Sequence, residues 1–496
     1  MSISKHLDVN IDAITKDFKD AGDLIHRKFP VGDDKKVWMY VAYIDLLVDR
    51  EFIETQVIRN IILTIPYFYP NGRGMYDPFE ALKERAMTTA DLKETDKYDE
   101  VTSAMLDGDA VLLVDGSTRA IILNAKGFPN RGVSTAETEA VVQGSREAFT
   151  EPFRFNTMLV RRRLRDINLK LLQFRIGRRT DVAVGIMYLD DIVRRPVLDD
   201  VVNRIKSLDV DAVLDLGHLE QLIEEDWVSP FPQAQLTERP DKAASAILEG
   251  RIAILLDNSP FALLVPSTFN VFFQASEDYY QRWEIATFLR LLRYVAGFIA
   301  FTLPAIYLVV AIYHPSMLPA DLVLKMAAAR QNIPFPAVIE ILFMDFAIEL
   351  LREAGLRLPG PLGGAIGVVG GLIVGEAAMI AGILSPVVII IVAMTAICGF
   401  AIPAVWFTSA YRIMKYLLII LSATLGLFGF WIGLLMTAIH LASLKSFGIP
   451  YMFPWSSGGI NGLADWQDTI FRLPFFTMKK RPIFADPNKP CRLKKE

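Results

Sequence analysis

The sequence predicts an α/β soluble N-terminal region of two related subdomains, followed by an all-α transmembrane bundle of four to five crossings. Hydrophobic residues make up 52% of the 496 residues but are spread unevenly along the chain. Short β-prone runs recur in the first half, whereas the second half holds apolar runs near the roughly 20 residues that cross a bilayer. Charged residues recur every few positions before Arg290, and the long apolar runs begin at Leu291. We therefore expect the two halves to lie in different solvents.

An internal repeat organises the first half. Three segments recur about 142 to 145 positions later in the chain: 43–48 as 188–193, 56–61 as 200–205, and 108–115 as 250–257. Asp-Gly or Asp-Asn turn signals follow the last pair, as in hairpins. Buried strands can resemble one another by chance, but an offset shared by three pairs favours duplication. The repeat predicts that Tyr43 and Tyr188 end equivalent strands.

The repeat and the apolar runs together divide the chain into six segments. These are an N-terminal helical extension at 1–35, a first α/β subdomain at 36–143, a basic connector at 144–180, a second α/β subdomain at 181–286, a transmembrane helical bundle at 287–446 and a C-terminal tail at 447–496. Arginines outnumber acids in the connector. Its candidates for contact with anionic lipid or another subunit are Arg161, Arg162, Arg163 and Arg165. The alternative is a solvated charged helix face.

Five apolar runs are candidates for membrane helices: 294–313, 336–354, 362–383, 386–407 and 416–444. Arg290 and Arg293 precede the first run, so the positive-inside rule places the N-terminal region in the cytoplasm. The run at 336–354 carries several charges and either spans the membrane or lies flat. Four or five crossings therefore stay open, and with them the side on which the tail emerges.

Ionisable residues within these runs are candidates for an ion path. On a helix Asp345 and Glu349 lie one turn apart on the same face, Glu340 lies in the same run, and Glu376 lies in the next. A carboxylate in lipid is costly, so each is expected beside water, a cation or a base such as Arg352. A pore role and structural pairing both stay open.

Glycine spacing predicts close packing of one membrane helix against another. Small residues at every fourth position let helix backbones approach closely. The glycines with this spacing are Gly363, Gly367, Gly371 and Gly375.

No pattern indicates catalysis, a cofactor, a metal or nucleic acid. Neither GxxxxGK[ST] nor HExxH occurs, and the five histidines are scattered. The two cysteines, Cys398 and Cys491, give neither a disulfide framework nor zinc-ligand spacing. A net charge of −4 is too small to indicate a nucleic-acid partner. The segment 1–18 contains acids and lacks a continuous apolar run, so no secretory signal is expected.

Several stretches resemble the GerA family, the A subunits of spore germinant receptors. They are 161–166 (RRRLRD), 277–283 (EDYYQRW) continuing to 290–294, 334–336 (PFP), 349–355 (ELLREAG) and 440–451 (HLASLKSFGIPY). The similarity runs from about residue 35 to the tail. It implies a multi-pass protein of the spore inner membrane with a cytoplasmic N-terminal domain. It also implies homo-oligomerisation, contact with membrane lipid, and partnership with a transporter-like B subunit and a lipoprotein C subunit.

The resemblance also implies a function, a nutrient-gated ion channel that releases monovalent cations. The short segment before the first subdomain is similar to the stage V sporulation paralogue AF of the same family, an accessory protein in ion release. Receptor subunit and accessory paralogue therefore both stay open. Two other classes do as well: a membrane-anchored signalling scaffold, and a solute transporter, which would be expected to show inverted repeats in its membrane half.

Overall fold

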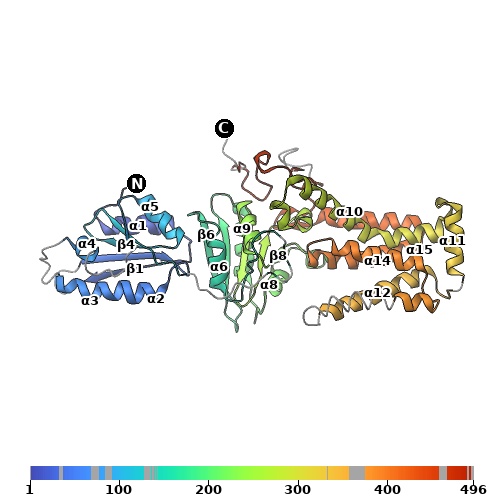
Figure 1. The fold of residues 1–496 in the computed structure, drawn as a ribbon, viewed down its shortest axis with the longest axis horizontal. Helices are drawn as coiled ribbons and strands as arrows, with labels where there is room; N and C mark the ends of the chain where they lie inside the picture. Colours follow the sequence, from blue (N-terminus) through green and yellow to red (C-terminus); the bar gives the residue numbers. More distant parts are fainter. Residues whose placement is uncertain are drawn as a thin grey trace. The chain divides into compact units, whose positions relative to one another are not determined.

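The chain divides into two units in the computed structural model (Figure 1). Unit 1 comprises Met1–Glu224, Ala234–Pro266 and Lys479–Glu496, and unit 2 comprises Glu225–Gln233 and Ser267–Met478. The described residues are 2–32, 37–68, 77–83, 92–127, 136, 139, 141, 143–331, 333–356, 375–456, 466–488 and 491–492.

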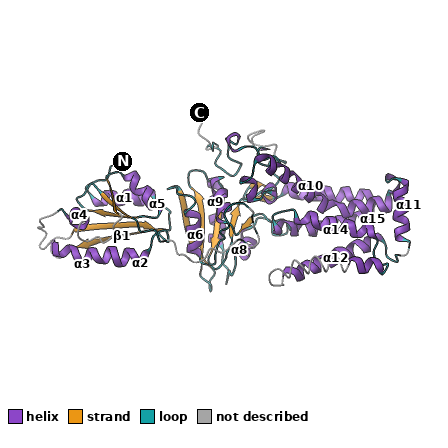
Figure 2. Ribbon diagram, viewed as in Figure 1, coloured by secondary structure: helices purple, strands orange, loops and turns teal. Residues whose placement is uncertain are grey.

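The first sheet of unit 1 has five antiparallel strands in the order β1-β2-β4-β5-β3. The strands are β1 (Leu24–Val31), β2 (Val37–Ile44), β3 (Leu92–Thr95), β4 (Ala110–Val114) and β5 (Ala120–Leu123). Helices cover both faces (Figure 2): α1 (Leu7–Asp17), the continuous helix of α2 (Arg50–Phe52), η1 (Ile53–Ile58) and α3 (Arg59–Phe68), α4 (Pro78–Ala81) and α5 (Tyr98–Asp107).

Strand β2 shows why two helical layers are needed. Tyr40 and Ala42 belong to the core cluster that contains residues of α1 and α5. Met39 and Val41 alternate with them and pack in the cluster that contains residues of η1 and α3. Because successive side chains of a strand point to opposite faces, an unbroken apolar strand must be covered on both sides.

The second sheet repeats the first. Its strand order is β6-β7-β9-β10-β8, which matches that of the first sheet position by position. The elements are β6 (Leu169–Ile176), β7 (Val182–Leu189), β8 (Gln235–Thr237), β9 (Ile252–Leu256), β10 (Ala262–Val265), α6 (Phe153–Arg161), α7 (Arg195–Ser207), α8 (Leu216–Ile223) and α9 (Pro240–Leu248). Tyr43 pairs with Ile25, and Tyr188 pairs with Lys170, 145 positions later in both strands. The predicted duplication is confirmed.

Several segment boundaries differ from those expected. The proposed extension 1–35 contains β1, and the proposed connector 144–180 contains β6, so both segments belong to the subdomains. Each is an edge strand with solvent-exposed polar residues, such as His26, Arg27 and Lys28, and so lacks an apolar run. The second subdomain ends at Pro266 rather than near residue 286. The predicted tail is split between the two units, because residues up to Met478 belong to unit 2 and Lys479–Glu496 belongs to unit 1.

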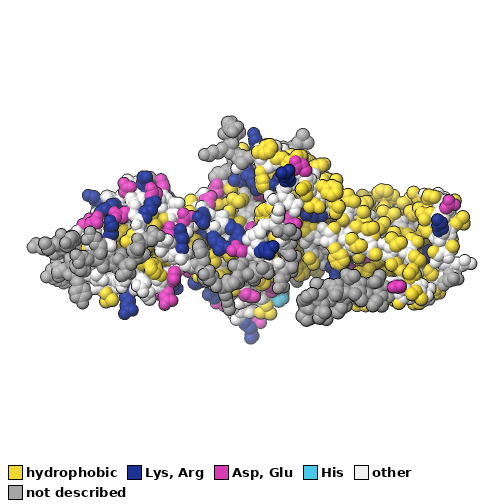
Figure 3. Space-filling view, viewed as in Figure 1, with side chains coloured by type: hydrophobic (Ala, Val, Ile, Leu, Met, Phe, Trp, Pro, Cys, Tyr) yellow, Lys and Arg dark blue, Asp and Glu magenta, His cyan; other side chains and the backbone are white. Residues whose placement is uncertain are grey.

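Unit 2 is helical. Its main elements are η4 (Phe269–Phe273), η5 (Ser276–Tyr279), α10 (Trp283–Leu308), η6 (Val309–Tyr313), η7 (Pro315–Met317), α11 (Ala320–Arg330), α12 (Ala337–Leu356), α14 (Pro386–Phe400), α15 (Val405–Ser443), β11 (Lys445–Ser446), β12 (Ile449–Pro450) and η9 (Phe475–Thr477). Two described helices, 283–313 and 405–443, are long and apolar enough to cross a membrane, with mean hydropathies of 2.4 and 2.2. Figure 3 shows hydrophobic side chains over much of the visible face of unit 2. Phe288 of the first helix and Phe428 of the second are 64% and 70% exposed.

Helix α15 is a hairpin of two antiparallel arms. Gly426 breaks it with φ 61° and ψ −138°, a conformation that is open to glycine. A Cβ on Gly429 would lie 1.9 Å from the carbonyl oxygen of Leu421, and one on Gly433 would lie 2.7 Å from a methyl of Leu418. Residues eight or more positions apart touch in this way only where the chain folds back. The Tyr313 hydroxyl donates 2.5 Å to the carbonyl of Ala423 at the turn.

Candidate functional site: a charge ladder between the membrane helices

Acidic side chains of α12 pair with basic side chains of the first arm of α15. Lys415 Nζ lies 2.6 Å from Asp345 Oδ1, and Arg412 Nη1 lies 2.7 Å from Glu349 Oε2. Arg352 Nη1 lies 3.6 Å from Glu349 Oε1 on the same helix. The two pairs form because α12 and this arm are antiparallel, so that residues one turn apart on each helix meet. We call these five residues the charge ladder.

One pair of the ladder is buried, since Asp345 and Lys415 are 5% and 4% exposed. Glu349, Arg352 and Arg412 are half-buried. A cavity of about 30 Å³ lies beside it, which is room for about one water molecule. Besides the five ladder residues, its lining includes Ala300, Thr395, Gly399, Thr408 and Tyr411. A site of this size and polarity can hold water or a small cation, but not an organic ligand.

The third predicted acid of α12 lies in a separate contact. Glu340 is 0% exposed, and its Oε2 accepts a 2.7 Å hydrogen bond from the backbone N–H of Ser385, the residue that caps α14. Arg330 Nη2 of α11 lies 3.1 Å from its other oxygen. A carboxylate at a helix N-terminus is stabilised by the unpaired N–H groups there. Glu340 therefore fastens three helices together.

The remaining predicted residues of the helical region do not join the ladder. Glu376 lies in the helical stretch 375–380 with an exposed side chain. Gly375 is buried, and a Cβ there would make ordinary contacts at 3.7 Å to Ile389 and 3.8 Å to Met344. Three glycines of the predicted seam lie outside the described residues, namely Gly363, Gly367 and Gly371. The packing seam stays a prediction.

The prediction that Arg161 contacts lipid or another subunit is wrong. Arg161 is 0% exposed and donates two hydrogen bonds of 2.8 Å to the Asp23 carboxylate and one of 2.8 Å to the carbonyl of Leu169. This ion pair joins the two subdomains of unit 1, because Asp23 precedes β1 and Arg161 ends α6. A buried charge must be paired and hydrogen-bonded, which accounts for the geometry.

The other three candidate arginines lie nearer the surface. Arg162 and Arg163 both pair with Glu147, and Arg165 Nη1 lies 2.6 Å from Asp107 Oδ1 in an exposed pair. Contact of these three with lipid or a neighbouring subunit stays a prediction.

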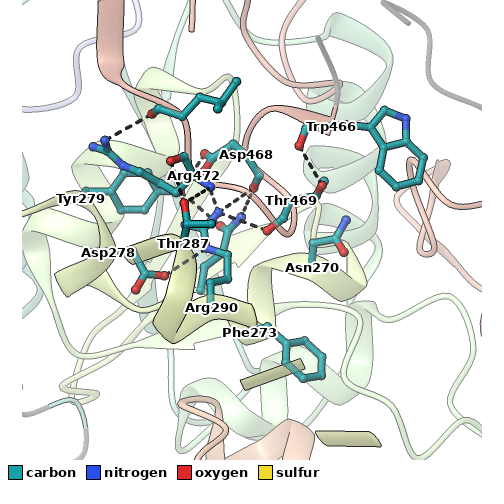
Figure 4. A network of polar contacts seen from close by, with 12 residues as sticks. Asn270, Phe273, Asp278, Tyr279, Thr287, Arg290, Trp466, Asp468, Thr469 and Arg472 are labelled. Atoms are coloured by element: carbon teal, nitrogen blue, oxygen red, sulfur yellow. Dashed lines mark hydrogen bonds and ion pairs between the residues drawn. The ribbon is translucent and has the colours of Figure 1, made fainter. Parts of the chain in front are cut away.

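A second buried charge cluster holds the start of α10 (Figure 4). Arg290 is 0% exposed, and its Nη1 lies 2.8 Å from Asp468 Oδ1 while its Nε lies 3.2 Å from Asp278 Oδ2. Arg293 Nη1 shares Asp278 at 2.8 Å, and the Tyr279 hydroxyl donates 2.8 Å to Asp468. The start of α10 is thereby tied to the segment around Asp468, which follows α15 in the sequence.

The sequence pattern predicted the acids of the ladder and offered Arg352 as a base, but it did not predict Arg412 or Lys415 as their partners. The available signal was spacing: two bases three residues apart just before the apolar run 416–444, and two acids four residues apart in the run 336–354. Both spacings put the charges on one helix face.

The fold and the site define a class: membrane proteins in which a duplicated α/β region is joined to a helical bundle with buried ion pairs. The chain belongs to the GerA family, because the family model described as Bacillus/Clostridium GerA spore germination protein matches residues 12–484. Its relatives are A-type spore germination subunits and a stage V sporulation protein.

Three relatives of Bacillus subtilis (strain 168) show the extent of the similarity. The uncharacterized membrane protein YfkQ is 38% identical over 97% of this chain and 91% of its own length. Spore germination protein KA is 37% identical over 97% of this chain and 87% of its own length. Stage V sporulation protein AF is 31% identical over 92% and 90%. The recognition of the family from sequence motifs is confirmed.

One solved structure also matches. It is the N-terminal domain of the A subunit of the Bacillus megaterium spore germinant receptor GerK3, 30% identical, with a TM-score of 0.43. The match covers 54% of this chain and 98% of that domain.

Proposed function

We propose that this chain is the A-type subunit of a spore germination receptor, and that it oligomerises in the spore inner membrane as a nutrient-gated channel for monovalent cations. The observation that carries the proposal is the charge ladder. Its five charges, beside a water-sized cavity, lie between helices whose outer surface is apolar. Ionisable residues at such a depth are costly and mark ion paths or structural pairs.

In the single chain each acid of the ladder already has a base, which corresponds to a closed path. Opening would separate α12 from the first arm of α15, so that water and cations replace Arg412 and Lys415 beside Asp345 and Glu349. In a ring of subunits the freed carboxylates would raise the local concentration of cations. No catalytic step is involved.

The proposal places both ends of the chain in the cytoplasm, with an even number of crossings. Glu340, near the start of α12, contacts Ser385 at the start of α14, so α12 and α14 run in the same direction. The hairpin of α15 adds two crossings rather than one. The described helices that take part are α10, α12, α14 and the two arms of α15.

The proposed partners are a transporter-like B subunit that senses the nutrient, a lipoprotein C subunit and further copies of this chain. The relatives named as spore germination proteins support the receptor assignment. The similarity to stage V sporulation protein AF supports a second candidate, an accessory protein that amplifies ion release. A mutant lacking this chain distinguishes the two: a receptor subunit is required for the response to one nutrient, whereas an accessory protein affects responses to several.

The test of conduction is the double substitution Asp345→Asn with Glu349→Gln in spores. Potassium release after addition of nutrient should slow several-fold, while the amount of the protein in the membrane stays the same. Glu353→Gln is the matched control, because Glu353 lies on the same helix with an exposed side chain. Unchanged rate and ion selectivity in the double variant would show that the ladder is structural.

A further inference from the structure

The C-terminal segment of the chain occupies a slot in unit 1. Ala485 forms a β-bridge with Val193, and the backbone N–H of Asp486 donates a 2.7 Å hydrogen bond to the carbonyl of Ile192. Arg194 Nε donates 2.9 Å to the carbonyl of Ala485. Phe484 and Ala485 are 5% and 4% exposed, so the segment is packed as core.

The first subdomain has the same slot with a different occupant. There Val48 forms a β-bridge with Lys126, and the N–H of Gly127 donates 3.3 Å to the carbonyl of Leu47. Val48 and Leu47 precede Val193 and Ile192 by 145 positions, the offset of the repeat. Lys126 and Gly127 therefore correspond to Ala485 and Asp486.

A glycine lies against each occupant. Gly108 and Gly250 precede the equivalent strands β4 and β9, and both have φ of +92°. A Cβ on Gly108 would lie 3.6 Å from Cγ of Lys126, and one on Gly250 would lie 2.6 Å from Cα of Ala485. In the second slot, the backbone of Ala485 therefore lies so close to Gly250 that any side chain at residue 250 would collide with it.

Chain connectivity explains why the occupants differ. In the first subdomain the occupant follows β5 by a few residues, so the adjacent chain fills the slot. After β10 the chain instead leaves unit 1 and forms unit 2. The duplicated slot would be left open, and a segment more than 200 residues later in the sequence fills it.

We propose that this slot is a peptide-binding site, and that the tail is its ligand and acts as a latch. The slot consists of Ile192, Val193, Arg194, Gly250 and Arg251. Its ligand is an extended segment with an aromatic, a small and an acidic residue in succession, here Phe484, Ala485 and Asp486.

Each ligand position has a partner. The Arg251 guanidinium lies 5.3 Å from the centre of the Phe484 ring, and Arg194 interacts with the charge of Asp486. Gly250 leaves room for the backbone of Ala485, whose side chain is buried. Backbone pairing supplies affinity and the side-chain positions supply selectivity, as in other additions of an extended strand. The latch holds the C-terminal segment against the second subdomain of unit 1.

A disulfide tests the latch in the full chain. The hydrogen bond from the N–H of Asp486 to the carbonyl of Ile192 flanks the bridge between Val193 and Ala485. Val193 and Ala485 are therefore a non-hydrogen-bonded antiparallel pair, and the Cα atoms of such pairs lie about 4.5 Å apart. That distance suits a disulfide. V193C/A485C should therefore oxidise within one chain, in a background where the exposed Cys491 is replaced by serine. V48C/K126C is the matched positive control in the equivalent slot.

Linked peptides and gel mobility without reductant give the outcome. A disulfide within one chain for both pairs supports the latch. Linkage of the control alone, or of V193C/A485C only between two chains, overturns it. The added substitution Phe484→Ala should slow formation of the V193C/A485C disulfide at least about fivefold, whereas the exposed Asn488→Ala should leave it unchanged; an equal rate for F484A overturns recognition of the aromatic residue.

Discussion

At the scale of single residues, burial distinguishes ion pairs that stabilise the fold from exposed ion pairs that contribute little to its stability. Arg161→Met leaves Asp23 buried without its cation, so we expect the free energy of unfolding to fall by about 3–5 kcal/mol. Denaturant unfolding of the full chain in detergent measures this loss. Arg165→Met is the control, because Arg165 and Asp107 are 55% and 40% exposed and their pair contributes about 1 kcal/mol or less. Equal losses in both variants would contradict the assignment.

Glu220 gives unit 1 a dependence on pH. Burial in α8 and the nearby charge of Glu224 raise the pKa of Glu220 from 4.5 to about 8. Because its pKa is higher in the folded than in the unfolded state, the contribution of Glu220 to stability is greatest below about pH 4.5 and falls as the pH rises to about 8. Glu220→Gln should remove this fall.

The variant should be more stable than the parent at pH 8, by about 1–2 kcal/mol after allowance for the partial exposure of Glu220, and similar to it near pH 4.5. Thermal unfolding across this pH range measures the difference. The exposed Glu51→Gln should follow the parent at every pH. A constant difference between E220Q and the parent would refute the titration.

At the scale of elements, the hairpin of α15 depends on close approach of its two arms. Gly429→Ala places a methyl 1.9 Å from the Leu421 carbonyl oxygen, so the arms must separate, and overpacking of this kind costs about 1–3 kcal/mol. Gly399→Ala is the control, since its methyl would meet Thr408 at an ordinary 3.9 Å. Thermal unfolding in detergent should show a clearly lower midpoint for G429A than for G399A. Equal midpoints would mean that the arms are not in contact.

At the scale of the whole molecule, the number of crossings decides on which side each loop lies. The proposed even number of crossings would put Cys491 and the Ser316 loop on opposite sides of the membrane. A membrane-impermeant maleimide should label S316C, in a C491S background, from outside intact cells, and should label Cys491 only after the membrane is opened. Cys398 is buried and serves as the internal negative control. Labelling of both positions from outside would require an odd number of crossings.

Flanking charges left a conflict in the sequence that the hairpin removes. If 336–354 spans, a single crossing at 416–444 would carry the basic tail outside, against the positive-inside rule. In the proposed topology, the two arms of α15 bring the tail back to the cytoplasmic side, and Arg352 and Arg412 lie near that side. The break is hard to read from sequence, because glycine occurs often in membrane helices and does not by itself reverse the chain.

The sequence alone determined the two halves, the duplication, the acids of α12 and the family, because apolar length, a fixed offset and local motifs are properties of contiguous residues. Only the tertiary structure decided that β1 and β6 join the sheets, that Arg161 is buried against Asp23, that Lys415 and Arg412 neutralise Asp345 and Glu349, and that the tail fills the second slot. Each of these depends on two segments distant in sequence meeting in space, and the spacing within one segment does not identify the segment that packs against it.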